Sequence, residues 1–358
     1  MALYFILIFV FLIFSLFSGR KQNHILPIVS FVILFVISAF RKQTVGGDLQ
    51  RYLPTFARVQ QTGWGDLLIW NDNEFSFMSE FGFRYLQKVM GYIDTSNQFY
   101  IIFTSFFVLS IAIYAINKYS LDKALSIFIY VSIIYLNSFN IIRACLSVAI
   151  CLLSYKYIRE KKLLPFVVLM FLAISVQRTS IFFLPAYFLY NVKLNVKFVL
   201  VALVAALFFS LALTGSQFAN FVNYYFSSFE ISEDTNLVNE SSSGLTMMAI
   251  FLLFTTILSI YVYRKRLIEN KKIEFLIYML VIATMIQFFS SVFILLNRIS
   301  LFYYSYLIFL IPHIEQKCFR NYSRLSYKFL YLIAFLAIYS VGILKDTNGI
   351  IPYLFFWE

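Results

Sequence analysis

Residues 98–117 read QFYIIFTSFFVLSIAIYAIN, and this stretch contains no Asp, Glu, Lys, Arg or His. An α-helix needs about 20 predominantly apolar residues to cross the hydrocarbon core of a bilayer. A helix that is apolar on every side has no face to present to water, so it belongs in a membrane or deep inside a large protein. The stretch therefore predicts a transmembrane helix.

The rest of the chain shares this composition. Of its 358 residues, 61% are hydrophobic and only 13% are charged, which is about half of the charged share of soluble domains. A soluble enzyme, a secreted domain and a disordered chain are thereby excluded. We expect an all-α, polytopic integral membrane protein: a single transmembrane domain over residues 1–358 with about 12 transmembrane helices. The candidate spans are residues 2–18, 25–40, 98–117, 124–138, 142–157, 163–176, 179–191, 198–214, 245–263, 273–296, 299–312 and 327–344.

Two of these candidates are short, residues 163–176 and 179–191, and they flank the polar pair Gln177-Arg178. Two interpretations are open for them. They are either two tilted spans or a pair of half-helices that does not fully cross the membrane.

Charged residues are distributed unevenly over the connections. Successive connections alternate between a set rich in Lys and Arg and a set that holds most of the Asp and Glu. Basic connections face the cytoplasm, so this alternation predicts that both termini lie outside. It also predicts two longer external loops, residues 41–97 and 215–244. The net charge of +12 then reflects membrane topology, and we expect no nucleic acid partner.

The cytoplasmic connections are all short, and no phosphate-binding glycine motif is present, which excludes ATP-driven work by this chain alone. Both histidines, His24 and His313, fall on the predicted cytoplasmic side. The cysteines, Cys145, Cys151 and Cys318, lie in or beside apolar runs and predict buried side chains rather than a disulfide or zinc site. We therefore expect no metal and no cofactor at an external active face.

Three arginines, Arg143, Arg178 and Arg298, lie within apolar stretches at the predicted outer ends of their helices. An arginine in hydrocarbon costs about 2.5–3.5 kcal/mol unless it reaches water or a partner. They either extend to the outer headgroups or form a cationic pocket for an anion, for which the planar fork of arginine suits phosphate. No counter-charge for Arg143 is evident from the sequence, so its removal is expected not to impair insertion.

The loop 41–97 opens with a candidate amphipathic helix. Asp48 follows a Gly-Gly pair and is a natural N-cap. The spacing of Asp48, Arg51, Tyr52, Thr55 and Arg58 places them on one side of the helix that follows. This side either is solvated, with local ion pairs, or contributes to a site. Interleaved acidic and aromatic residues later in the loop are compatible with sugar recognition and equally with an interfacial aromatic belt.

Several short motifs resemble those of the EpsG/Wzy-type polysaccharide polymerase family. They extend from about residue 40 to the C-terminus. The resemblance rests on the order of the motifs along the chain and on the side of the membrane predicted for each. One departure is that the family usually has a histidine where this chain has Gln177-Arg178. The resembling segments are Gly47-Asp48 with Tyr52, Ile142-Arg143-Ala144, Asn297-Arg298-Ile299 with Tyr303, Tyr304 and Pro312, and Ile351-Pro352-Tyr353.

This resemblance implies a glycosyltransferase of the bacterial inner membrane. Such an enzyme joins oligosaccharide repeat units carried on undecaprenyl pyrophosphate into O-antigen or exopolysaccharide at the outer leaflet. A flippase and a chain-length regulator are then expected membrane partners. Asp48, Arg143 and Arg298 are the expected catalytic residues. The expected substrate-binding residues are Arg51, Tyr52, Gln177, Arg178, Asn297, Tyr303 and Tyr304.

Two other functions were weighed. A flippase or other transporter of lipid-linked oligosaccharide needs charge along its path through the membrane, yet residues 98–117, 198–214 and 245–263 carry none. A membrane acyltransferase normally needs a histidine base on the working side, where none is predicted. The sequence favours the polymerase.

Overall fold

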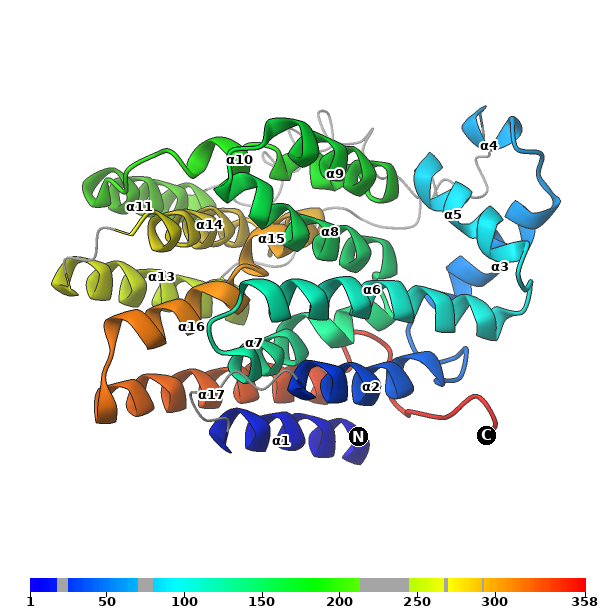
Figure 1. Ribbon diagram of the computed structural model, residues 1–358, viewed down its shortest axis with the longest axis horizontal. Helices are drawn as coiled ribbons and strands as arrows, with labels where there is room; N and C mark the ends of the chain where they lie inside the picture. The colour runs from blue at the N-terminus through cyan, green and yellow to red at the C-terminus, as the bar shows by residue number, and fades with distance from the viewer. Residues whose placement is uncertain (18–24, 70–79, 213–244, 267–269, 292) are drawn as a thin grey trace.

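The computed structural model describes residues 1–17, 25–69, 80–212, 245–266, 270–291 and 293–358. Within these ranges the chain is mostly helical and contains no β-strand; an isolated bridge pairs Arg41 with Phe355. The long helices run roughly along the longest axis of the molecule (Figure 1). The all-α class expected from the sequence is confirmed.

Several helices are apolar enough to cross a membrane. Four stretches also have the full length for it: α6 (Asn97–Tyr119), α13 (Met247–Arg266), the stretch Leu295–Cys318 and α17 (Asn321–Leu344). Shorter apolar helices accompany them, so the chain is built as a multi-pass membrane protein, and the count of twelve spans stays a prediction. The shorter helices are α1 (Ala2–Phe17), α2 (Ile25–Ala39), the irregular stretch Lys123–Phe139, α9 (Leu163–Val176) and α11 (Val196–Ala212).

Two further long helices carry charged residues near their ends. Both α8 (Ile142–Arg159) and α14 (Lys271–Phe288) have 18 residues, but charged side chains occupy their terminal turns. The stretch after Tyr119 starts as α7 (Lys123–Tyr130) and continues as a π-helical turn and a 3₁₀ turn up to Phe139.

Two candidate spans differ from expectation. Residues 179–191 form no regular span: a 3₁₀ helix, η4 (Arg178–Phe183), is followed by the one-turn α10 (Ala186–Leu189). The expected boundary at residues 297–298 is wrong, because α14 ends at Phe288 and α15 (Ile294–Tyr304) starts before it. The Ser290 hydroxyl donates to the Gln287 carbonyl at 2.8 Å, a local bond that competes with the helical pattern.

The core of the bundle forms around α8, which packs against α6 and α9, while α14 packs against α11, α13 and α15. Almost every residue of α8 is buried. The outer helices instead expose large apolar side chains; Val201 and Phe208 of α11 are 69% and 67% exposed, and Ile333 of α17 is 66% exposed. Soluble proteins rarely expose apolar surface on this scale, so we interpret this surface as facing lipid.

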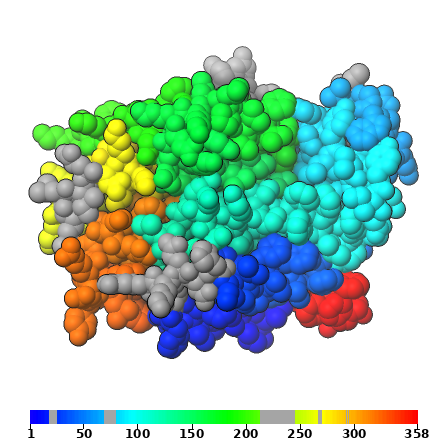
Figure 2. All heavy atoms as spheres, viewed as in Figure 1, coloured from blue at the N-terminus to red at the C-terminus, as the bar shows by residue number. Residues whose placement is uncertain are grey.

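Connections that the sequence assigns to the external side meet at one end of the bundle. The Gly46 backbone N–H donates to the Gly349 carbonyl at 2.9 Å, and Lys42 donates likewise to Leu354 at 2.9 Å. Figure 2 shows the C-terminal segment in red at this end, beside the end of α2 and below the cyan helices that follow it. The loop 215–244 lies outside the described residues.

Connections assigned to the cytoplasmic side meet at the opposite end. The Lys328 ammonium forms a buried ion pair with Asp122 at 3.0 Å, and the Gln316 amide donates to the Leu121 carbonyl at 2.6 Å. Which of the two ends faces outside stays a prediction from the charges.

At the external end, Gly46 lets the loop after α2 pass close to Phe139. Gly46 has φ of +112°, a conformation that residues with a Cβ rarely adopt. A Cβ at this position would also collide with the Phe139 carbonyl oxygen. The loop after α2 can therefore pass directly over the end of the α7 stretch and present the residue that follows the glycine pair.

Candidate functional site

A buried ion pair lies at the centre of the external end. The Arg143 guanidinium at the start of α8 pairs with the Glu80 carboxylate, and each residue is only 2–3% exposed. The second carboxylate oxygen of Glu80 accepts a hydrogen bond from the Arg178 backbone N–H at 3.2 Å. Glu80 thus joins α8, η4 and the start of α5 (Phe81–Gly91).

Small external helices fix the position of Glu80. Gly82 lets α5 approach α9, since a Cβ there would collide with Ser175. At the other end of α5, the buried Lys88 ammonium closes the C-terminal end of α3 (Leu49–Gln61), where a cation also interacts favourably with the helix dipole. It donates to the carbonyls of Val59, Gln60 and Thr62 at 3.1, 2.7 and 2.8 Å.

Tyr52 connects the ion pair to the rest of α3. Its hydroxyl accepts from Arg143 Nε at 3.4 Å, and the Arg143 guanidinium lies 5.8 Å from its ring centroid. Burial raises the pKa of Tyr52, while the charges of Arg143 and Arg298 lower it and that of Asp48 raises it. Residues from three separate parts of the sequence therefore act on one phenol.

Asp48 precedes α3, as expected, but its side chain makes no capping hydrogen bond. The predicted N-cap position is confirmed, but Asp48 does not cap with its side chain. Its φ of −76° and ψ of −11° are helical, whereas a residue that caps with its side chain has non-helical, typically extended backbone angles. Its backbone N–H instead donates to the Asn140 side-chain oxygen at 2.7 Å. This bond holds Asp48 next to the segment that leads into Arg143.

A further arginine, Arg84 of α5, lies in the same region and is 3% exposed. Burial lowers its pKa; the Glu80 carboxylate raises it and the charge of Arg178 lowers it. The charges of Glu80 and Arg178 therefore both act on the pKa of Arg84. The arrangement gathers four guanidinium groups and two carboxylates, from Arg84, Arg143, Arg178, Arg298, Asp48 and Glu80.

The assumption that Arg143 lacks a counter-charge is corrected by this geometry. A buried guanidinium is costly without an acid partner, and Glu80 supplies one. Sequence analysis also missed Arg84 and Asn140. Glu80 and Arg84 are four residues apart at the start of a helix, which places them on one face. Their proximity to Arg143 and Arg178 depends on the tertiary structure.

The residues expected on one side of α3 differ in their burial. Tyr52 and Thr55 are buried, whereas Arg51 is exposed. The Arg51 carbonyl accepts a hydrogen bond from the Thr55 hydroxyl at 2.8 Å. Gln177 is 1% exposed, and its amide donates to the Thr179 hydroxyl at 3.3 Å.

The expected residues of α15 lie at different depths. The exposed Asn297 accepts from the Gln287 amide of α14 at 3.2 Å. The Tyr303 hydroxyl donates to the Phe182 carbonyl, which ties α15 to η4, and Tyr304 is buried in the core. Tyr303 thereby supports the segment that begins with Arg178.

In the described ranges no group of three or more His, Cys, Asp or Glu side chains gathers as a metal site would require. The cysteines are free and buried, as the sequence predicts. The site is instead rich in fixed guanidinium donors next to a phenol and a carboxylate. Such a set can hold an anion with several charge-assisted hydrogen bonds and act on a neighbouring hydroxyl.

Comparison with known proteins identifies a family. A model described as the EpsG family matches residues 24–355, which includes Glu80, Arg143, Arg178 and Arg298 but not α1. No curated protein and no solved structure matches the chain significantly.

Proposed function

The chain belongs to the EpsG family, and from this premise we propose that it is a membrane glycosyltransferase that polymerises polysaccharide. Its substrates are oligosaccharide repeat units on undecaprenyl pyrophosphate, and it joins them into O-antigen or exopolysaccharide at the outer leaflet of the bacterial inner membrane. A flippase that delivers the units and a chain-length regulator are its proposed membrane partners.

The observation that carries this proposal is the convergence at one end of the bundle. Arg143 contacts the buried Tyr52, and the charges of Arg298 and Asp48 act on the pKa of the same phenol. The Arg178 backbone N–H and the Arg143 guanidinium both bind Glu80. Preorganised cations at the point where negative charge develops stabilise a transition state without reorganisation. In the transfer of a sugar from a lipid pyrophosphate, that charge develops on the departing phosphate.

These positions support the following reaction. The bond between the anomeric carbon of the donor sugar and its pyrophosphate oxygen breaks, and a bond to an acceptor hydroxyl oxygen forms. Arg143, Arg298 and Arg178 hold the departing pyrophosphate. Asp48 polarises the acceptor hydroxyl and takes its proton.

Glu80 has a defined part in this scheme. It neutralises the buried charge of Arg143, and it fixes the Arg178 backbone. The excess of guanidinium groups over carboxylates leaves the site electropositive with Glu80 in place, so a pyrophosphate binds beside the pair rather than by displacing the acid.

The test is polymerisation in vitro. Full-length protein purified in nanodiscs is given undecaprenyl-pyrophosphate-linked repeat units without ATP and without nucleotide sugars. We expect a ladder of lipid-linked glycans. Failure to form any product longer than one repeat, by protein that is folded and at several substrate concentrations, would reject the proposal.

Cells provide a second readout that separates the polymerase from a flippase. Deletion of a polymerase leaves a surface glycan that is one repeat long, because single units still reach the surface. Deletion of a flippase leaves no surface glycan. A single-repeat product supports the proposal, and complete absence supports transport.

A further inference from the structure

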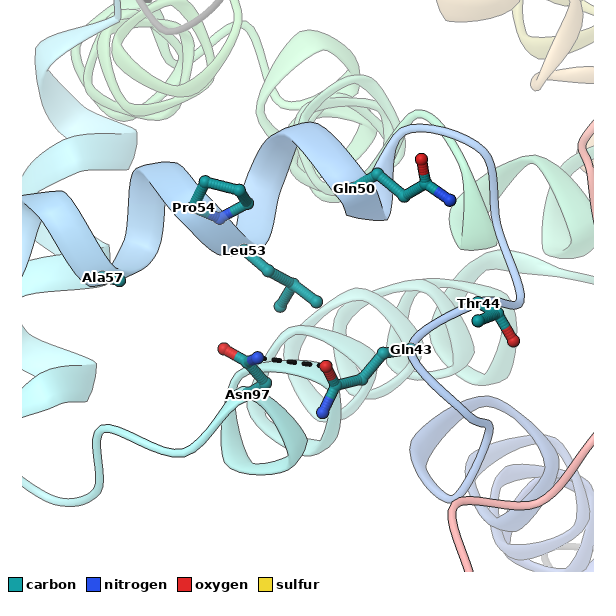
Figure 3. Close-up of a pocket in the computed structure, with 7 residues that line it drawn as sticks. All are labelled: Gln43, Thr44, Gln50, Leu53, Pro54, Ala57 and Asn97. Atoms are coloured by element: carbon teal, nitrogen blue, oxygen red, sulfur yellow. Dashed lines mark hydrogen bonds between the residues drawn. The ribbon is translucent and has the colours of Figure 1, made fainter. Parts of the chain in front are cut away.

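A pocket opens at the external end, on the side of α3 that faces away from the arginine site. It has a volume of about 440 Å³, within the range of roughly 300–1,000 Å³ that is usual for ligand sites. Among the described residues, none that lines it has an ionisable side chain. Its lining consists of Gln43 and Thr44 after α2, Asn97 at the start of α6, and Gln50, Leu53, Pro54 and Ala57 of α3 (Figure 3).

The helix α3 separates this pocket from the charged site. The pocket residues on α3, from Gln50 to Ala57, follow the spacing of one helical face. Tyr52, Phe56 and Val59 are buried on the other face, and Tyr52 contacts Arg143 there. One short helix thus presents an uncharged surface on one side and supports the cationic site on the other.

The pocket wall combines amides with an apolar floor. The Asn97 amide donates to the Gln43 side-chain oxygen at 3.0 Å, which ties the loop after α2 to α6. Figure 3 shows Leu53 pointing toward this pair, with Pro54 and Ala57 beside it on the helix. Amide side chains both donate and accept hydrogen bonds.

We infer that this pocket is a saccharide subsite, which holds uncharged sugar residues of the glycan away from the reacting pyrophosphate. Sugar hydroxyls need partners that donate and accept, as Gln43, Gln50 and Asn97 do. The C–H face of a pyranose ring packs on an apolar surface such as that of Leu53 and Pro54. The lack of charge favours a neutral ligand over an anion. This inference rests on the proposed function.

Binding of lipid-free glycan tests the subsite without requiring catalysis. The probe is the surface polysaccharide of the cells that express this protein, released from its lipid by mild acid. Its affinity for the full-length protein in nanodiscs is measured by biolayer interferometry. Ala57→Trp fills the pocket and Asn97→Leu removes the amide; each should weaken binding about tenfold, the effect of roughly one lost polar interaction.

A control variant keeps the result interpretable. Val89→Trp places the same bulk at an exposed position of α5 outside the pocket, and its binding should equal that of wild type.

Four outcomes are decisive. Loss of binding in Ala57→Trp with normal binding in Val89→Trp supports the subsite, and this result does not depend on whether the proposed polymerase activity is found. Equal binding by Ala57→Trp and wild type, loss of binding in both tryptophan variants, or no binding by wild type would each overturn it.

Discussion

The Arg143 guanidinium and the Glu80 carboxylate form an ion pair that is almost fully buried, although 63 positions separate them in the sequence. Breaking such a pair by removing one partner leaves an uncompensated charge. The pair therefore affects both the stability of the fold and the proposed anion site. Mutations can separate the effect on stability from the effect on polymerisation.

Arg143→Met removes the charge but keeps much of the side-chain volume. We expect it to destabilise the protein by about 3–5 kcal/mol, because Glu80 is left buried without its partner. Thermal unfolding in detergent measures this effect. The double variant Arg143→Met/Glu80→Gln should recover most of the stability, since neither charge remains and the glutamine oxygen still accepts from the Arg178 backbone.

Glycan length in cells then separates the two roles of Arg143. The double variant should fold but leave glycans of one repeat, because the anion site has lost a guanidinium group. Wild-type chain length from the double variant would show that the pair is structural only.

Gly46→Ala tests the loop that presents Asp48. The positive φ of Gly46 and the collision of a Cβ with Phe139 predict destabilisation by about 1–3 kcal/mol. Gly342→Ala is the matched control, because a Cβ at this helical position meets nothing within 4 Å. It should be neutral or stabilising by up to about 1 kcal/mol. Equal melting temperatures for the two variants would contradict this account of Gly46.

Sequence analysis predicted the helical class because long apolar runs leave few alternatives to a membrane helix. It also singled out Arg143 and Arg298, since charges are conspicuous in apolar segments. It could not find Glu80 as the partner of Arg143, because an acid in a polar loop looks like any solvated residue until the fold buries it. The boundary near Ser290 was missed because a serine bond to the backbone leaves no trace in hydropathy.

The orientation of the bundle is testable with the native cysteines in place. Cys145, Cys151 and Cys318 are at most 5% exposed and should not react with a membrane-impermeant maleimide. Thr44→Cys at the predicted external end should be labelled from outside intact spheroplasts. Tyr322→Cys at the opposite end, where the tyrosine is 88% exposed, should be labelled only after lysis. The reverse pattern would invert the topology and place the candidate site in the cytoplasm.

The sharpest test asks whether Arg178 and Arg298 act by charge alone or by the geometry of the guanidinium. Each alanine variant should lower the rate of polymerisation by about 100-fold, as loss of one preorganised donor does at other sites where charge develops, with normal amounts of protein in the membrane. Lysine keeps the charge but lacks the planar fork that binds phosphate through two parallel hydrogen bonds. We therefore expect Arg298→Lys and Arg178→Lys to restore chain length only in part. Arg320→Ala, at an exposed position near the opposite end, is the control and should leave chain length unchanged. Full rescue by lysine would show that the arginines act by charge alone and not by two parallel hydrogen bonds to phosphate. Wild-type glycans from both alanine variants would mean that these side chains only anchor the helices at the membrane surface.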